Sequence, residues 1–165
     1  MRDLDLRRAT RADHAALQAL QSNSVVHVAG AHYSGEQVEA FLRDAKAAVR
    51  DVLNRARLWV LADGDCLVAC AGWQRTGARD VVELRSVYVR EGWTRRGLAG
   101  RLLDWVERDA AKVGARHARL HAMRGSEPFY AARGYAPVGE VTFDLGGVPF
   151  PGLTMAKPLA ADART

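Results

Sequence analysis

The sequence has 165 residues, of which 48% are hydrophobic and 26% charged, and its formal net charge is +5. This length fits one domain spanning 1–165, and the apolar content excludes a wholly disordered chain. No apolar stretch approaches the roughly 18 residues of a membrane-spanning helix, and the first residues alternate charge with leucine instead of forming a signal sequence. We therefore expect a cytoplasmic protein that does not contact membranes.

Neither the basic residues nor the cysteines indicate a specialised site. The arginines are spread along the chain and alternate with acidic residues, whereas a nucleic-acid-binding domain usually concentrates them, so we expect no nucleic-acid partner. Cys66 and Cys70 lie on one predicted strand at roughly 13 Å, too far apart for a disulfide. No metal-ligand spacing is present, and we expect no metal and two buried thiols.

The first part of the chain predicts one short strand and two helices. Alternation over 4–7 predicts the strand, and Thr10 is placed to cap a helix of about three turns. Ser34 is placed to cap a second helix, which helical spacing of apolar residues extends to Leu53. The intervening segment 24–33 is expected to be a loop.

From residue 57 the hydrophobic period changes from helical to alternating. The spacing predicts the following elements: strands over 58–62, 66–74 and 80–89, a long amphipathic helix over 98–113, a strand over 118–122, a short helix over 126–133, and strands over 136–144 and 152–158 with a stiff loop at 146–152. This order predicts an α/β chain with a mixed, mostly antiparallel sheet. It also predicts one right-handed β-α-β crossover over 80–122.

The start of the long helix has the composition of an anion-binding site. A helix start carries unpaired N–H groups and partial positive charge, and Gly97 and Gly100 would let an anion approach the backbone, with Arg95 and Arg96 adding formal charge. The same small residues would equally serve close packing of the helix on the sheet, so the spacing alone leaves both interpretations open. The segment lacks the phosphate-loop and dinucleotide-binding patterns, which disfavours ATP and NAD.

Two motifs in this region resemble those of the GNAT superfamily of acetyl-CoA-dependent N-acetyltransferases. Residues 94–99 (TRRGLA) are similar to the family's loop, Gln/Arg-x-x-Gly-x-Gly/Ala, except at Thr94. Residues 129–135 (FYAARGY) are similar to its FYxxxGF block, and 83–89 (ELRSVYV) look like the strand that precedes the loop. The motifs also follow the family's order.

The resemblance implies a GNAT-like fold and acetyl-CoA as cosubstrate. In that family the pyrophosphate lies on the helix start and the pantetheine lies along the preceding strand edge. The residues implied to bind the cosubstrate are Val87, Tyr88, Val89, Arg95, Arg96, Gly97, Leu98, Ala99 and Gly100. Thr94 and Met123 depart from the family's usual polar residues, which removes two side-chain contacts and leaves the backbone cradle.

Two side chains are candidate catalytic residues. The family position of Tyr130 places its phenol near the departing sulfur, where it would donate a proton. Glu83 is the candidate general base, directly or through water. Strict alternation would put it on the face of Val87 and Val89, among apolar neighbours. The alternative is a surface glutamate paired with an arginine such as Arg85.

The implied activity is transfer of an acetyl group to a primary amine by direct attack in a ternary complex, since neither motif contains a cysteine to carry the acyl group. Two alternatives remain: a non-catalytic acetyl-CoA-binding or regulatory module on the same fold, and a basic nucleic-acid-binding domain. The acceptor is expected to be a small-molecule or peptide amine. His27, His32 and Tyr33 lie where the family's acceptor pocket often begins, and the edge strands would allow a homodimer.

Overall fold

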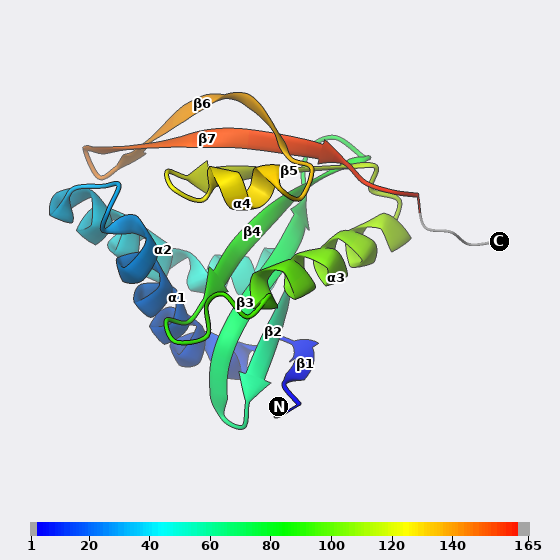
Figure 1. Ribbon diagram of the computed structural model, residues 1–165, viewed down its shortest axis with the longest axis horizontal. Coiled ribbons are helices and arrows are strands. Elements are labelled where there is room, and N and C mark those ends of the chain that lie inside the picture. The colour runs from blue at the N-terminus through cyan, green and yellow to red at the C-terminus, as the bar shows by residue number, and fades with distance from the viewer. Residues whose placement is uncertain (1–2, 162–165) are drawn as a thin grey trace.

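The computed structural model describes residues 3–161 and contains a seven-stranded mixed sheet with helices on both faces (Figure 1). The strands are β1 (Asp5–Arg8), β2 (Arg57–Asp63), β3 (Cys66–Arg75), β4 (Val81–Val89), β5 (His117–Met123), β6 (Ala136–Leu145) and β7 (Val148–Pro158). The helices are α1 (His14–Ala29), α2 (Gly35–Arg55), α3 (Leu98–Lys112) and α4 (Glu127–Ala131), with a short 3-10 turn at Arg11–Asp13. The α/β class and the predicted crossover are confirmed.

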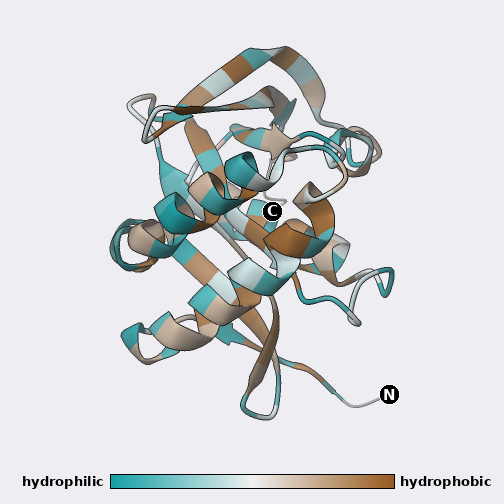
Figure 2. Ribbon diagram, turned by 90° about the vertical axis from the view of Figure 1, so that its left-hand side faces the viewer, coloured by the Kyte–Doolittle hydropathy of each residue, from teal (hydrophilic) through white to brown (hydrophobic). Residues whose placement is uncertain are grey.

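The strand order is β1-β2-β3-β4-β5-β7-β6, and only the β4–β5 pair is parallel. One core lies between the sheet and α3, around Leu102, Leu103 and Val106. A second core lies between the other face and α1 with α2, around Leu20 and Val60. In Figure 2 the helices alternate between teal and brown, and the strands of the β2–β3 hairpin are brown up to their teal turn. The helices therefore pack on the sheet by apolar stripes.

The expected loop at 24–33 is wrong, because α1 continues to Ala29. Val25 and Ala29 are fully buried and extend the helical spacing, but Gln21 and Ser24 are buried on the same face. Polar residues on a buried face hide the amphipathic pattern from the sequence. The predicted cap at Ser34 is present: its hydroxyl accepts from the Gln37 N–H at 3.1 Å.

The expected loop at 146–152 is also wrong. Gly146 and Gly147 have positive φ angles of 65° and 89° and form a tight turn, so β7 begins directly at Val148. Pro149 and Pro151 lie in the part of β7 that pairs with β6 alone, since pairing with β5 begins at Gly152. A strand with one free edge tolerates proline there, because no second ladder needs its N–H.

A β-bulge interrupts β4 at Ser86, whose φ is +55°. Cys70 pairs with Tyr88 and Gly72 pairs with Arg85, so β4 has one residue more than β3 between these pairs. The Cys70 thiol donates to the Ser86 carbonyl at 3.1 Å and so contacts the bulge directly. An extra residue shifts the alternation of all side chains that follow it.

The bulge overturns the expected common face of Glu83, Val87 and Val89. Val87 and Val89 pack against the core on the α3 side. Tyr88 instead packs with the residues under α1 and α2. Glu83, which precedes the bulge, points to the face of β4 opposite to that of Val87. The apolar neighbours that we expected for Glu83 therefore lie on the other side of the sheet.

The parallel pair β4–β5 separates soon after it begins. Val81 to Glu83 pair with His117 to Arg119, and beyond these residues the two strands have no mutual pairing. The start of α3 follows the far end of β4, and α4 follows the far end of β5. The opening between the strands is thus bordered by both segments that the sequence motifs single out.

Candidate active site

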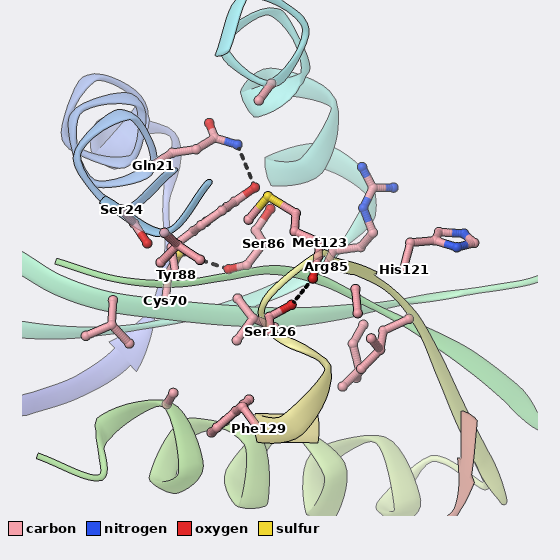
Figure 3. Close-up of a pocket in the computed structure, with 18 of the residues that line it drawn as sticks. Gln21, Ser24, Cys70, Arg85, Ser86, Tyr88, His121, Met123, Ser126 and Phe129 are labelled. Carbon is pink, nitrogen blue, oxygen red and sulfur yellow. Dashed lines mark hydrogen bonds between the residues drawn. The ribbon is translucent and has the colours of Figure 1, made fainter. Parts of the chain in front are cut away.

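A cavity of about 870 Å³ lies where β4 and β5 separate, a volume typical of small-molecule sites. Its walls come from β4, β5, the loop that leads into α3, α4, and the two helices α1 and α2 (Figure 3). Every predicted site residue except Arg96 lines it: Glu83, Val87, Tyr88, Val89, Arg95, Gly97, Leu98, Ala99, Gly100 and Tyr130. The Arg96 guanidinium instead lies over the Trp93 ring, 4.8 Å from its centroid.

The first turn of α3 presents free backbone donors to this cavity. Arg95 and Gly97 have positive φ angles of 60° and 74°, which set the turn into the helix. Within residues 3–161, the N–H groups from Gly97 to Gly100 donate to no acceptor, and the Arg101 N–H is bonded to the Gly97 carbonyl at 3.0 Å. No acidic side chain occupies this turn. Four unpaired donors at a helix start form a favourable environment for an anion.

Gly100 has a different role, because it contacts the second motif. A Cβ atom at this position would lie 2.6 Å from the Arg133 Nη1 atom. Arg133 also donates through Nη2 to the Gly100 carbonyl at 2.9 Å and to Asp104 at 2.6 Å. Gly97 therefore sets the turn into α3, and the lack of a side chain at Gly100 leaves room for the Arg133 guanidinium.

Beyond Glu83, the side of β4 that faces β5 forms an open strand edge along the cavity. Tyr88 points from this strand towards α1, where Gln21 Nε2 donates to its phenol oxygen at 3.1 Å (Figure 3). Burial raises the pKa of Tyr88 to about 12, although the Gln21 hydrogen bond opposes the shift. A strand edge without a partner can accept an extended molecule as an added strand.

Tyr130 lines the cavity from α4 and is only 8% exposed. Its ring contacts Phe129 and Tyr135 edge to face, with centroid distances of 5.1 and 5.9 Å. Burial raises its pKa, with a further contribution from nearby Tyr88. No hydrogen-bond partner for the phenol occurs in the described part of the chain. The phenol therefore stays protonated at neutral pH and can donate its proton.

Glu83 lies in a polar environment, and its side chain is 15% exposed. Gln74 Nε2 donates to one carboxylate oxygen at 3.1 Å, and His121 Nε2 lies 3.2 Å from the other. On the far side of the imidazole, Nδ1 lies 3.0 Å from the Thr154 hydroxyl. The alternative pairing of Glu83 with Arg85 is not found, and the partner is a histidine on the neighbouring strand.

Sequence reasoning missed the roles of His121 and Gln74. The signal for the contact of His121 with Glu83 is the register between β4, β5 and β7, which a single sequence does not contain. His27, His32 and Tyr33 do not line the cavity. The Tyr33 hydroxyl instead donates to the Pro151 carbonyl at 2.6 Å and accepts from the Arg124 N–H at 2.8 Å.

Two further expectations concern metals and membranes. Among the residues that the structure describes, no three side chains of the metal-ligating types are grouped closely enough to hold an ion. Within the same range, no helix combines the length and apolar character needed to span a bilayer.

Comparison with known proteins places this geometry in a family. The family model of the GNAT acetyltransferase domain matches residues 29–157. Because this match covers most of the chain, the chain belongs to the GNAT acetyltransferase family, and it is an acyltransferase. None of the curated proteins matches the chain.

Solved structures share the fold over nearly the whole chain. A GCN5-related N-acetyltransferase from Rhodopseudomonas palustris is 25% identical, with a TM-score of 0.83 and coverage of 96% of this chain and 98% of that one. The PaiA N-acetyltransferase from Thermoplasma acidophilum, solved with coenzyme A, is 19% identical, with a TM-score of 0.76 and coverage of 95% and 99%. An aminoglycoside 6'-N-acetyltransferase complexed with coenzyme A is 17% identical, with a TM-score of 0.68 and coverage of 97% and 99%. The expected GNAT-like fold is confirmed.

The two thiols differ in exposure, and this difference allows a test of whether Cys70 is buried in the cavity wall. Cys66 is exposed, contrary to expectation, whereas Cys70 is buried beside the bulge and burial raises its pKa to about 12. The thiolate is the reactive form, so a raised pKa lowers the reactive fraction at pH 8. We predict that Ellman's reagent titrates one fast thiol in the folded protein and that Cys66→Ser removes it. Fast labelling of Cys70 in that folded variant would contradict the buried position.

Proposed function

We propose that this protein transfers an acetyl group from acetyl-CoA to a primary amine by direct attack in a ternary complex. The observation that carries the proposal is that free N–H groups at the start of α3, an unpaired β4 edge, and the side chains of Glu83 and Tyr130 all face one cavity. An anion site, a strand-like groove and a pair of groups for proton transfer are the parts that this reaction requires.

The cosubstrate would be bound mainly by backbone groups. The N–H groups of Gly97 to Gly100 would donate to the pyrophosphate, and Arg95, which lines the same end of the cavity, would add positive charge. The open edge of β4 at Val87 to Val89 would pair with the pantetheine amides. When bound, acetyl-CoA supplies an activated thioester carbonyl.

The side chains divide the proton transfers between them. Glu83, held by Gln74 and His121, would take the proton of the acceptor ammonium, directly or through water. Tyr130, kept neutral by burial, would donate a proton to the sulfur as the C–S bond breaks, and the second proton lost by the acceptor nitrogen would restore its phenol. The bulge at Ser86 would turn a backbone N–H toward the reacting carbonyl oxygen.

Direct attack is favoured over an acyl-enzyme because the thiol in the cavity wall is a poor nucleophile. Cys70 lines the cavity, but its thiol donates to the Ser86 carbonyl and burial raises its pKa to about 12. It therefore stays protonated at neutral pH.

Gly97→Ala tests the backbone cradle. The positive φ at Gly97 strains any other residue, so the free N–H groups would lose their alignment. We expect the Kd of acetyl-CoA, measured by calorimetry, to rise about 10-fold. Gly64→Ala is the matched control, since Gly64 has a similar φ of 58° with equally open space and lies in the β2–β3 turn. Equal affinities of the two variants would remove the cradle from the binding site.

Tyr130→Phe tests the proton donor. Removing the hydroxyl keeps the packed ring, so kcat should fall by about 100-fold while acetyl-CoA affinity changes less than about twofold. The control is Tyr135→Phe in the same motif, whose hydroxyl donates to Glu107 away from the cavity. That variant should lose stability and keep its kcat when assayed below its melting temperature. An unchanged kcat in Tyr130→Phe would exclude the acid role.

Glu83→Gln tests the general base. The variant keeps the size of the side chain but cannot accept a proton, so kcat should fall by about 100-fold and the pH profile of kcat should change. Asp80→Asn is the matched control. Asp80 directly precedes β4, and its exposed carboxylate lies 3.7 Å from the His117 imidazole, so it is also an acidic residue next to a histidine. A pH profile of Glu83→Gln that matches the wild type would contradict the assignment.

A further inference from the structure

Arg85 is a charged residue in the cavity wall that the proposed reaction does not use. It lies on β4 between Glu83 and the bulge, and it is only partly exposed. Within residues 3–161, no carboxylate lies within 4.0 Å of its guanidinium, and no hydrogen bond from it is found. Figure 3 shows the guanidinium above β4, directed toward α2, with His121 to one side. Asp44 on α2 and Glu83 also line this cavity, but neither carboxylate forms an ion pair with the guanidinium.

The bulge brings Tyr88 onto the face of β4 that Arg85 and Glu83 already share by alternation. Arg85 pairs with Gly72 before the bulge and Tyr88 pairs with Cys70 after it, so both side chains lie on the α1–α2 face together with Glu83. The charge of Arg85 also reaches the Tyr88 phenol, where it opposes the larger effect of burial on the pKa. Arg85 thus adjoins the candidate base on one side and the cavity wall at Tyr88 on the other.

An unpaired guanidinium at this place has two consequences. It carries an uncompensated desolvation cost because it is partly buried. It also repels an ammonium group that approaches Glu83, since like charges a few ångströms apart disfavour each other. Both effects disappear when the molecule that brings the amine also brings an anion to Arg85. The planar guanidinium fork matches a carboxylate, which it binds through two parallel N–H donors.

We propose that Arg85 binds a carboxylate of the acceptor, so that the acceptor is a small molecule bearing an amine and a carboxylate a few ångströms apart, such as an α-amino acid. This inference rests on the proposed acetyl transfer and names its acceptor class. Phe41, Leu145 and Phe150 line the same cavity and form an apolar surface for the acceptor's side chain. An amino acid with an apolar side chain could bury that side chain against this surface.

The phosphates of the cosubstrate do not account for Arg85. The free N–H groups and Arg95 lie beyond the far end of β4, whereas Arg85 precedes the bulge. Between Arg85 and Val89 the strand alone spans roughly 13 Å at the usual rise per residue. An anion held at the start of α3 is therefore too distant to pair with Arg85.

Matched acceptors test the proposal through acetyl-CoA consumption. The set is L-phenylalanine, L-phenylalaninamide, phenethylamine, the phosphonate analogue of phenylalanine, and spermidine. We expect kcat/KM for the amino acid to exceed that for the amide and for the amine by at least about 10-fold. A preference for the phosphonate, for spermidine, or for the amide or amine that lacks the carboxylate would overturn the carboxylate assignment.

Arg85→Gln should lower kcat/KM for phenylalanine by at least about 10-fold, mainly through KM, and should change kcat/KM for the amide by less than about threefold. Arg85→Lys should recover part of the loss, because it restores the charge but not the fork. Arg79→Gln removes an exposed arginine from the β3–β4 turn and serves as the control. It should leave kcat/KM unchanged for both phenylalanine and the amide. An equal loss for acid and amide in Arg85→Gln would overturn the proposal.

Calorimetry separates this inference from the proposed reaction. Phenylalanine is titrated into protein saturated with coenzyme A, and Arg85→Gln should weaken its binding about 10-fold while the Kd of acetyl-CoA stays unchanged. Acetylation of amines with no effect of Arg85→Gln would contradict the carboxylate site and leave acetyl transfer standing. Binding of phenylalanine through Arg85 without turnover would support the site and contradict the proposed reaction. Absence of both acetyl-CoA binding and phenylalanine binding would overturn both.

Discussion

The arrangement of this molecule depends on how briefly β4 and β5 pair. Only Val81 to Glu83 meet β5, and beyond them each strand runs along its own direction. Backbone N–H and C=O groups at an inner strand edge need partners, and here the edge faces a cavity instead of another strand. The helix that follows β4 then begins at the same opening, so its free N–H groups face the same space. One interruption of the sheet thus brings the open edge of β4 and the unpaired N–H groups of α3 to the same cavity.

The bulge at Ser86 changes which side chains of β4 share a face. Glu83 and Arg85 lie on the α1–α2 side by alternation, and because of the extra residue Tyr88 joins them, whereas Val87 and Val89 join the core under α3. Glu83 is fixed by Gln74 and His121, and Tyr130 approaches from α4 on the opposite wall. The acid and the base of the proposed reaction therefore come from different strands and helices, and a common cavity connects them. Cys70 contacts the bulge through its thiol.

Sequence reasoning succeeded where a local pattern had one structural meaning. The alternation in β2 to β5, the amphipathic spacing of α3 and the composition of its first turn identified the fold and the segments that border the cavity. It failed where the decisive feature was not local. Nothing in ELRSVYV marks an extra residue at Ser86, and the buried polar Gln21 and Ser24 concealed the end of α1. The contact between His121 and Glu83 depends on register across strands, which a single chain does not encode in any short window.

The contact between Arg133 and Gly100 bears on how this scaffold can be diversified. The guanidinium occupies the volume that a side chain at position 100 would need, and it also holds the helix through the Gly100 carbonyl and Asp104. Substitutions at these two positions will not combine additively, because each changes the space available to the other. A mutant library that varies one motif alone would discard combinations that become acceptable when both are varied. Positions 100 and 133 are therefore best randomised as a linked pair.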